Sequence, residues 1–311
     1  MQIVQKWSPL EPFLRGAAVA LGNFDGVHRG HVKLLQAAHA ARPDLPLAVL
    51  TFEPHPREFF RPDDPPFRLT LADEKATALA AHGVTLIYQL AFDDTFAAMT
   101  AKDFLDNVLD RGIGARHICC GPDFAFGNRR GGDVAVLSNW SEQASIGLTI
   151  VPALTDAKGQ ISSSRIRHLL QGGYPEQAAE ELGRPWSLRG VVVHGDARGR
   201  QIGFPTANLS LGRHLEPARG VYAVTVACHE MTSFLEFGVA NIGRRPTVNG
   251  LDTRLEVHLF DFDADLYGKT LDIALISFIR AEKKFPSLQD LKAQIKLDVA
   301  RSRALLGQAQ R

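Results

Sequence analysis

The chain has 311 residues but only three cysteines, no long apolar run and almost no net charge. Three scattered cysteines cannot supply a disulfide framework, and without a Cys-x-x-Cys pair a structural zinc site is not predicted. No apolar run approaches the roughly 18 residues that a membrane span needs. The N-terminus has no apolar segment followed by a small-residue cleavage site, which a signal peptide requires. These absences predict a cytoplasmic protein with no membrane partner.

The near-neutral charge conceals two unequal halves. Lys and Arg number 35 against 34 Asp and Glu, for a net charge of +1. Residues 1–182 carry 17 basic against 21 acidic side chains, whereas residues 183–311 carry 18 against 13. A nucleic-acid binder needs a basic face with interleaved aromatics, and the arginines of the second half instead cluster beside glycines. We therefore predict no nucleic-acid partner, and the excess positive charge is either solvated surface or serves small phosphate ligands.

The first half of the chain has the pattern of an α/β fold. Hydrophobic residues at 45% and charged residues at 22% are ordinary for globular chains, and this length predicts two domains. Apolar runs such as 16–21 and 47–52 alternate with helical patterns such as 29–41. Such alternation predicts a mostly parallel sheet with helices on both faces, whose ligands bind at the carboxyl ends of the strands.

The second half follows a different pattern. Runs such as 188–194 and 221–227 are rich in β-branched and aromatic residues and are separated by Gly, Pro, Asn and Asp. This spacing predicts an antiparallel barrel or sandwich. One amphipathic helix, 287–306, closes the chain. We predict a first domain over residues 1–182 and a second domain over residues 183–311.

The first candidate site follows the run 16–21 and reads GNFDGVHRGH over residues 22–31. Its glycines permit close approach of the backbone to a ligand, and the next helix directs N–H groups that favour anions toward the same space. His28 and His31 share the first helical turn and suit hydrogen bonds to phosphate oxygens. The alternatives are that one histidine caps the helix while the other is buried, or that the two bind a metal.

Three further segments occupy places where ligands bind in an α/β fold. Segment 51–60, TFEPHPREFF, follows the second strand, and segment 121–133, GPDFAFGNRRGGD, follows the fourth. Both carry aromatics that can stack on a planar ring, although core aromatics and a flexible glycine loop explain them equally well. Segment 161–167, ISSSRIR, combines hydroxyls at a helix start with two arginines, which suits phosphates or is an ordinary serine cap.

The second candidate site lies in the β-rich half. Residues 194–208 read HGDARGRQIGFPTAN, a glycine- and arginine-rich loop of the kind that binds phosphate. Thr206 and Asn208 share a face if the segment is extended, and they offer two oxygens to a Mg²⁺ that is also held by substrate phosphates. Glu256, in an apolar strand, is either a general base for a hydroxyl or an outward-facing surface residue.

Together these motifs resemble a known family. The HxGH sequence and the serine-rich segment are similar to signatures of the nucleotidyltransferase superfamily, which transfers a nucleotidyl group and releases pyrophosphate. The loop over 194–208, with NIGRRPT at 241–247, EVH at 256–258 and RAEKKF at 280–285, resembles the riboflavin kinase domain. In this order, and over nearly the whole chain, the motifs resemble the bacterial bifunctional riboflavin kinase/FMN adenylyltransferases, also called FAD synthetases.

The resemblance implies a Rossmann-like nucleotidyltransferase parallel sheet followed by an antiparallel β-barrel domain with a C-terminal helix. It implies that ATP phosphorylates riboflavin to FMN, and that a second ATP adenylylates FMN to give FAD and pyrophosphate. The implied ligands are riboflavin, FMN, ATP and Mg²⁺. The alternative is a single-activity nucleotidyltransferase whose barrel binds flavin without catalysis. The sequence does not define the oligomeric state.

Residue roles follow from the same resemblance. The implied catalytic residues are Glu256, His28, His31 and Arg167. The implied ATP- and phosphate-binding residues are Gly22, Phe24, Asp25, Gly30, Ser163, Ser164, Gly199 and Arg200. The implied flavin-binding residues are Pro56, Asp123, Phe126 and Arg280, and the implied metal ligands are Thr206 and Asn208. Two positions depart from the family pattern: Ser164 stands where Thr is usual, which keeps a hydroxyl, and Asp123 stands where some members have Asn.

Overall fold

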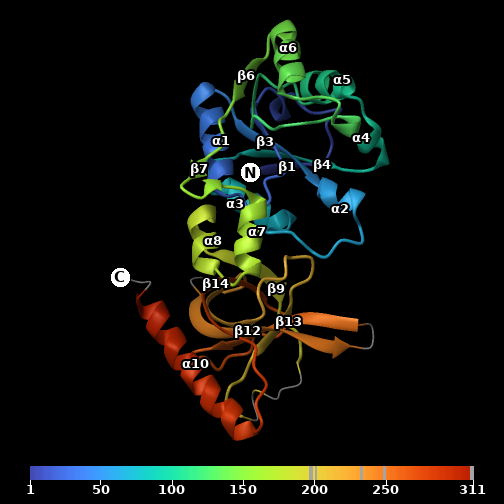
Figure 1. Cartoon of the computed structure of the whole chain (residues 1–311). Helices are drawn as coiled ribbons and strands as arrows, with labels where there is room; N and C mark the ends of the chain where they lie inside the picture. The colour runs from blue at the N-terminus through green and yellow to red at the C-terminus, as the bar shows by residue number, and fades with distance from the viewer. Residues whose placement is uncertain (196–198, 200–201, 232–233, 248–249, 309–311) are drawn as a thin grey trace. The chain divides into compact units, whose positions relative to one another are not determined.

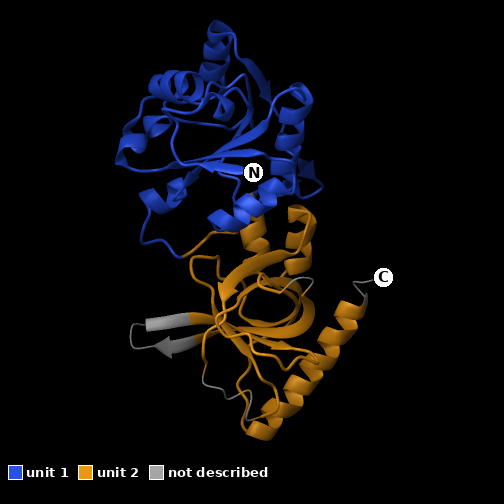
Figure 2. Cartoon of the chain, turned by 180° about the vertical axis from the view of Figure 1, so that it is seen from behind, with its two compact units in different colours: residues 1–65, 70–162 blue, residues 66–69, 163–311 orange. Residues whose placement is uncertain are grey.

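The computed structural model describes the chain except for residues 196–198, 200–201, 232–233, 248–249 and 309–311. The chain forms two compact units, which Figures 1 and 2 show. Unit 1 comprises residues 1–65 and 70–162, and unit 2 comprises residues 66–69 and 163–311. The short segment 66–69 is therefore distant in sequence from the rest of its unit. We describe the two units in turn.

Unit 1 is built from parallel strands and intervening helices (Figure 1). Its strands are β1 (Gln2–Val4), β2 (Ala18–Leu21), β3 (Leu47–Glu53), β4 (Leu86–Ala91), β5 (His117–Cys120) and β6 (Gly147–Ile150), with a small hairpin of β7 (Thr155–Asp156) and β8 (Gly159–Gln160). Its helices are α1 (Arg29–Ala41), α2 (Pro56–Phe60), α3 (Ala72–Ala80), α4 (Asp94–Ala98), α5 (Ala101–Asp103) and α6 (Val134–Ala144). A π-helical segment, η2 (Phe104–Gly112), and two short 3₁₀ turns, η1 (Pro12–Leu14) and η3 (Asn128–Arg130), complete it.

The sheet of unit 1 has the strand order β1-β4-β3-β2-β5-β6, and every neighbouring pair is parallel. From β2 the chain moves outward through β3 and β4, and it then returns to place β5 on the other side of β2. The order therefore reverses between β2 and β5. In open α/β sheets, ligands bind outside the carboxyl ends of the strands at such a reversal.

Both faces of this sheet are buried, as a parallel sheet covered by helices requires. Val19 and Leu21 belong to one hydrophobic cluster, and Ala20, between them, belongs to another. The same alternation holds in β3, where Leu50 faces the first cluster and Val49 the second. Successive side chains point to opposite faces, so the apolar runs of the sequence pack in two layers.

Unit 2 begins with two helices and continues as antiparallel strands (Figure 1). Its helices are α7 (Ser163–Gln171), α8 (Pro175–Leu182) and α10 (Leu288–Gln308). Its strands are β9 (Trp186–Val191), β10 (Ala207–Ser210), β11 (Gly220–Cys228), β12 (Leu235–Thr247), β13 (Gly250–Leu259) and β14 (Thr270–Ala281). The strand order is β10-β13-β12-β11-β14-β9.

The antiparallel sheet closes on itself just beyond β9. The backbone N–H of Val193 donates to the carbonyl of Asn208 at 2.9 Å, which joins the two outer strands. Tyr222 and Val224 point into the interior of this barrel, whereas Val221 and Ala223 belong to the cluster that α10 covers with Leu306. The barrel thus has a core of its own, and α10 packs against its outer face.

The predicted fold class is confirmed, and the structure adds elements that the sequence patterns did not indicate. The predicted helix 29–41 is α1 with the same bounds. Strands β1 and β10 were not predicted, because β1 has only three residues and the first two residues of β10 belong to segment 194–208, which was interpreted as a loop. The compact units divide at residues 162 and 163. The predicted boundary between residues 182 and 183 separates the two domains that are expected to carry different activities, and it stays a prediction.

Candidate functional site

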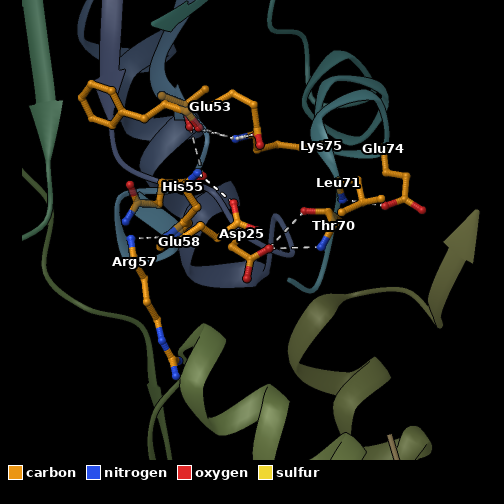
Figure 3. Close-up of polar contacts among 12 residues, drawn as sticks. Asp25, Glu53, His55, Arg57, Glu58, Thr70, Leu71, Glu74 and Lys75 are labelled. Atoms are coloured by element: carbon orange, nitrogen blue, oxygen red, sulfur yellow. Dashed lines mark hydrogen bonds and ion pairs between the residues drawn. The ribbon is translucent and has the colours of Figure 1, made fainter. Parts of the chain in front are cut away.

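The turn between β2 and α1 has a backbone that few sequences can adopt. Phe24 and Val27 have φ values of 53° and 44°, and both side chains are fully buried. Non-glycine residues pay for this left-handed conformation, so the surroundings must hold it in place. Asp25 does so: its carboxylate accepts the backbone N–H of Thr70 at 3.1 Å, and Thr70 Oγ1 accepts the N–H of Gly26 at 3.0 Å (Figure 3).

The two histidines cap helix α1 reciprocally. His28 is the N-cap, and its Nδ1 accepts the backbone N–H of His31 at 3.3 Å. Nδ1 of His31 accepts the backbone N–H of His28, also at 3.3 Å. The two rings stack with centroids 3.6 Å apart. The alternative that a histidine caps the helix is therefore confirmed. Capping uses only one nitrogen of each ring, however, and leaves Nε2 of each ring for another partner.

Capping fixes the tautomer of both imidazoles. Because each Nδ1 accepts a backbone N–H, each neutral ring carries its proton on Nε2, where it is a hydrogen-bond donor. Burial lowers the pKa of His31 well below the usual value, and the charges of His28 and Lys75 lower it further. His31 is thus a neutral donor at the N-terminus of a 13-residue helix, where anions are favoured.

Two of the three glycines of this turn, Gly22 and Gly30, leave room for aromatic rings. A Cβ at Gly30 would lie 3.0 Å from Cε1 of His28, so a side chain there would displace the imidazole. A Cβ at Gly22 would lie 3.2 Å from the ring of Phe24. Gly30 of the HxGH motif therefore serves the packing of His28, and Gly22 serves that of Phe24, in addition to the open approach to a ligand.

The loop after β3 repeats the capping by histidine. His55 is the N-cap of α2 and accepts the N–H of Arg57 at 3.0 Å, while its own N–H donates to Glu58 at 3.0 Å (Figure 3). Pro56 is the first residue of this short helix, which is the position where proline is best tolerated. The loop is therefore held rigidly at the carboxyl end of β3, beside β2 in the sheet.

The loop after β5 places its two predicted flavin residues differently. Asp123 is exposed, whereas Phe126 is 8% exposed and packs in the core against Phe104 and Phe124. A Cβ at Gly132 would lie 2.5 Å from the ring of Phe126. Phe126 is thus a core aromatic, and the half-buried Phe124 is nearer the surface. The contact of Asp123 and Phe126 with flavin stays a prediction.

Sequence reasoning missed Lys75, which lies close to the turn between β2 and α1. Its side chain is 2% exposed, and its ammonium donates to Thr51 Oγ1 at 3.1 Å. Leu71 and Leu79 lie four residues before and after it, and α3 buries this face. Helical periodicity could therefore have placed the lysine on an apolar face, where a buried charge indicates a specific role.

The serine- and arginine-rich segment lies at the start of α7 in unit 2. Ser163 is the first residue of this helix, and Ser164 is exposed. Arg167 donates from Nε to the carbonyl of Phe67 at 2.8 Å and lies over the phenyl ring of Phe67, 5.1 Å from its centroid. Arg165 pairs with Glu181 of α8 at 2.5 Å. The two arginines of the segment are thus held in place by different partners.

Strand pairing brings together the predicted residues of the barrel. Asn208 in β10 lies directly opposite Glu256 in β13, and Glu256 lies opposite Asn241 in β12. Side chains of directly opposed residues share a face, with Cβ atoms about 5 Å apart. Glu256 is exposed, and Asn208 is 7% exposed. The carboxylate of Glu256 therefore lies between two amide side chains on one face of the sheet.

The corner before β10 is fixed by close contacts. Asn208 donates from Nδ2 to the carbonyl of Thr206 at 3.3 Å, and His258 donates from Nδ1 to the carbonyl of Pro205 at 2.8 Å. A Cβ at Gly199 would lie 2.3 Å from the carbonyl oxygen of Phe204. Glycine at position 199 therefore permits the loop to touch this corner. Arg200 lies outside the described residues, so its predicted contact with phosphate stays a prediction.

A cavity of about 600 Å³ opens beside the same corner. The residues that line it include Thr206, Ala207, Val257 and Tyr267. Asn208 follows Ala207 in β10, and Glu256 precedes Val257 in β13. Because side chains alternate along a strand, the pair of Asn208 and Glu256 lies on the face of β10 and β13 opposite to Ala207 and Val257. Thr206 precedes β10 and lines the cavity.

Arg280 at the end of β14 is engaged by the C-terminal helix. Its guanidinium donates to both carboxylate oxygens of Asp298, at 2.7–3.1 Å, and Asp298 is 4% exposed. Gln294 also donates to Asp298 at 2.9 Å. This ion pair holds α10 against the barrel, and the predicted flavin contact of Arg280 stays a prediction.

The side chains of the site offer few ligands to a metal ion. Among the residues that the structure describes, no group of three or more His, Cys, Asp or Glu side chains is placed to hold a cation. Thr206 and Asn208 offer neutral oxygens, and Asn208 directs its Nδ2 toward the protein. Such a pair fits Mg²⁺ only if substrate phosphates supply most of the coordination.

Comparisons with known proteins match both halves of the chain. Residues 10–165 match the FAD synthetase family, and residues 182–306 match the riboflavin kinase family. The bifunctional riboflavin kinase/FMN adenylyltransferase of Escherichia coli K12 is 42% identical over 94% of this chain and 93% of its own length. The protein of the same description from Bacillus subtilis is 37% identical over 91% and 90%.

A solved structure has the same fold as this chain. A protein of Streptococcus pneumoniae described as a macrolide-efflux protein is 35% identical, with a TM-score of 0.85 over 95% of this chain and 97% of that chain. Within the described part of this chain, no helix has the length and apolar character that crossing a membrane requires. The matches in sequence and fold, together with the two sites, show that the chain belongs to the family of bifunctional riboflavin kinase/FMN adenylyltransferases.

Proposed function

We propose that the chain makes FAD from riboflavin in two steps at two separate sites. The barrel phosphorylates riboflavin with ATP to give FMN and ADP, and the parallel-sheet half joins FMN to the AMP part of a second ATP, releasing pyrophosphate. The observation that carries this proposal is that two unrelated arrangements suited to phosphate occur on one chain, a histidine-capped helix after β2 and the β10–β13 corner. Each falls within the family match of the corresponding activity.

In the kinase step, Glu256 is the group placed to act as general base. The riboflavin 5′-hydroxyl would give its proton to the carboxylate as its oxygen attacks the γ-phosphorus of ATP and ADP leaves. The register with Asn208 and Asn241 supports this role, because it places a polar amide side chain on each side of the carboxylate. Gly199 and Arg200 would contact the phosphates of this ATP, and Arg280 the flavin.

Mg²⁺ belongs to this proposal as part of the bound nucleotide. Thr206 Oγ1 and Asn208 Oδ1 would hold it, and it would offset the negative charge of the transferred phosphoryl group. The bond from Asn208 Nδ2 to the Thr206 carbonyl supports this role, because it leaves the amide oxygen as the ligand atom.

In the adenylylation step, no protein nucleophile is needed, because a phosphate oxygen of FMN attacks the α-phosphorus of ATP and pyrophosphate leaves. His28 and His31 would donate from Nε2 to the phosphates, and the α1 N-terminus adds its own N–H groups. Arg167 would pair with the departing pyrophosphate, together with Ser163 and Ser164 of the same helix. Catalysis then consists of positioning and charge stabilisation.

The remaining residues of this half would shape the pocket and bind flavin. Gly22, Phe24, Asp25 and Gly30 build the histidine turn, as their packing supports. The proposed flavin contacts are Pro56, Asp123 and Phe126. We also propose that residues 1–182 and 183–311 are the functional domains, that the protein is cytoplasmic, and that its ligands are small molecules.

Chromatography of the products from riboflavin, ATP and Mg²⁺ over time tests the proposal. FMN is expected first and FAD second, with one ADP formed for each FMN and one pyrophosphate for each FAD. If FAD forms only from supplied FMN and riboflavin stays unchanged, the barrel binds flavin without catalysis and the two-step proposal fails. If supplied FMN also stays unchanged, the assignment of adenylylation fails as well.

A further inference from the structure

Unit 1 contains a buried lysine that the reaction scheme does not use. Lys75 of α3 is 2% exposed, and its ammonium lies against the carboxyl end of β3 (Figure 3). It donates to Thr51 Oγ1 at 3.1 Å and to the Phe52 carbonyl at 3.5 Å, and it lies 3.7 Å from Glu53 Oε2. Removing an ammonium from water is costly, and an apolar side chain of the same length would fill this space at lower cost.

The contacts of Lys75 lead to both loops of the candidate adenylylation site. Thr51 is fully buried, and its hydroxyl donates to the carbonyl of Asn23 at 3.1 Å, in the turn that contains the left-handed Phe24. The lysine therefore fixes the Thr51 hydroxyl as a donor toward the histidine turn. On its other side it holds Glu53, the last residue of β3 before the loop that leads to α2.

The ammonium also acts on the histidines through its charge. His31 packs against His28 at 3.6 Å and against Phe24 at 5.0 Å between ring centroids. His28 and Lys75 are the two charged or titratable groups that act on His31, and both lower its pKa. A neutral His31 keeps its proton on Nε2 as a donor and, unlike an imidazolium, does not repel the ammonium.

We propose that Lys75 is a positioning residue for adenylyl transfer, which holds the β2–α1 turn through Thr51 and places a permanent positive charge beneath the phosphates. The inference rests on the proposed adenylylation of FMN. As pyrophosphate departs, negative charge grows at the phosphates, and a fixed ammonium in a dry interior stabilises that charge without rearranging. The charge therefore favours the transition state more than the bound substrates, so its loss lowers kcat more than it raises KM.

The test replaces Lys75 by methionine, which keeps the length of the side chain and removes the charge. With supplied FMN and ATP, we expect K75M to lower kcat of FAD formation by about 10- to 100-fold, while KM for FMN changes less than about threefold. Riboflavin phosphorylation by the same protein, which takes place in unit 2, serves as the internal control of the amount of active protein and is expected to stay within about twofold of wild type. Lys102→Met, at a lysine of unit 1 that is 82% exposed, is the matched control and should leave both activities unchanged.

A spectroscopic readout separates positioning from a structural role. Without the ammonium, the pKa of His31 should rise, so its ring signals in NMR titrate at higher pH in K75M than in wild type or K102M. Thr51→Val and Thr51→Ser supply a second pair in case K75M does not fold. T51V should lose adenylylation severalfold, and T51S, which keeps the hydroxyl, should retain it.

The outcomes distinguish this inference from the function on which it rests. If wild type forms no FAD from FMN, the proposed function fails. If wild type is active while folded K75M has an unchanged kcat and an unchanged His31 titration, the inference about Lys75 is overturned. It is overturned equally if T51V and T51S retain the same adenylylation rate as wild type.

Discussion

The two units build their candidate sites in different ways. In unit 1 the chemistry lies on loops at the ends of parallel strands, where glycines and capping histidines shape a helix N-terminus. In unit 2 it lies on the strands themselves, where antiparallel register places Asn208, Glu256 and Asn241 side by side. We propose that both bind phosphate, one through backbone N–H groups and neutral imidazoles, and the other through side chains of a sheet face.

The difference predicts which changes each site tolerates. A loop site depends on local conformation, so substitutions that disturb a cap or a left-handed residue affect function through the backbone. A sheet site depends on pairing between distant segments, so single side chains can be exchanged with little change in the backbone. Substitutions at the two sites therefore show whether their activities are as separate as their construction.

Removing the proposed base should abolish only one activity. Glu256→Gln keeps the shape of an exposed side chain but cannot accept a proton, so riboflavin phosphorylation should fall on the order of a thousandfold. Conversion of supplied FMN to FAD should stay within about twofold of wild type, because the change leaves unit 1 untouched. Glu236→Gln, on β12 of the same barrel, is the control. Equal loss of both activities in a folded E256Q protein would refute separate sites.

Removing the first histidine should have the opposite effect. Asn is a good N-cap, so His28→Asn retains the cap of α1 while it removes the Nε2 donor. Adenylylation of FMN should fall by about 100-fold, and riboflavin phosphorylation should be unchanged. His39→Asn, at an exposed histidine in the last turn of α1, is the matched control. If H28N adenylylates FMN as fast as wild type, the imidazole has no role in the reaction.

Acid should destabilise unit 1 through His31. Its pKa is lowered in the folded chain, so below a pH of about 6.5 the unfolded chain binds a proton that the folded chain does not. The free energy of unfolding should therefore fall as pH decreases from there toward the folded pKa, by up to about 1.4 kcal/mol for each pH unit. Urea unfolding of wild type and His31→Gln tests this, and an identical pH dependence in both would contradict it.

The cysteines should be inert in the folded protein. Burial raises the pKa of Cys119 to about 11 and of Cys120 to about 12, and it also raises the pKa of Cys228. The thiolate is the reactive form, so a thiol reagent at mildly alkaline pH should label none of the three until denaturant is added. Rapid labelling of one cysteine in the native protein would show that its surroundings open readily.

The sequence predicted the loop site better than the sheet site. Glycines and histidines after an apolar run identify the β2–α1 turn without knowledge of the fold, because its residues are adjacent in the chain. The pairing of Asn208 with Glu256 joins residues 48 positions apart, so alternation alone favoured the interpretation of Glu256 as a surface residue. Lys75 and Thr70 were missed because their importance lies in contacts with Thr51 and Asp25 of other segments.

The most direct test of two separable activities mixes two proteins that each lack one of them. With riboflavin, ATP and Mg²⁺, E256Q alone should form neither FMN nor FAD, and H28N alone should accumulate FMN. The mixture should form FAD, because FMN released by H28N is a substrate for E256Q. If the mixture of the two folded variants forms no FAD, the account of two independent sites linked by free FMN is contradicted.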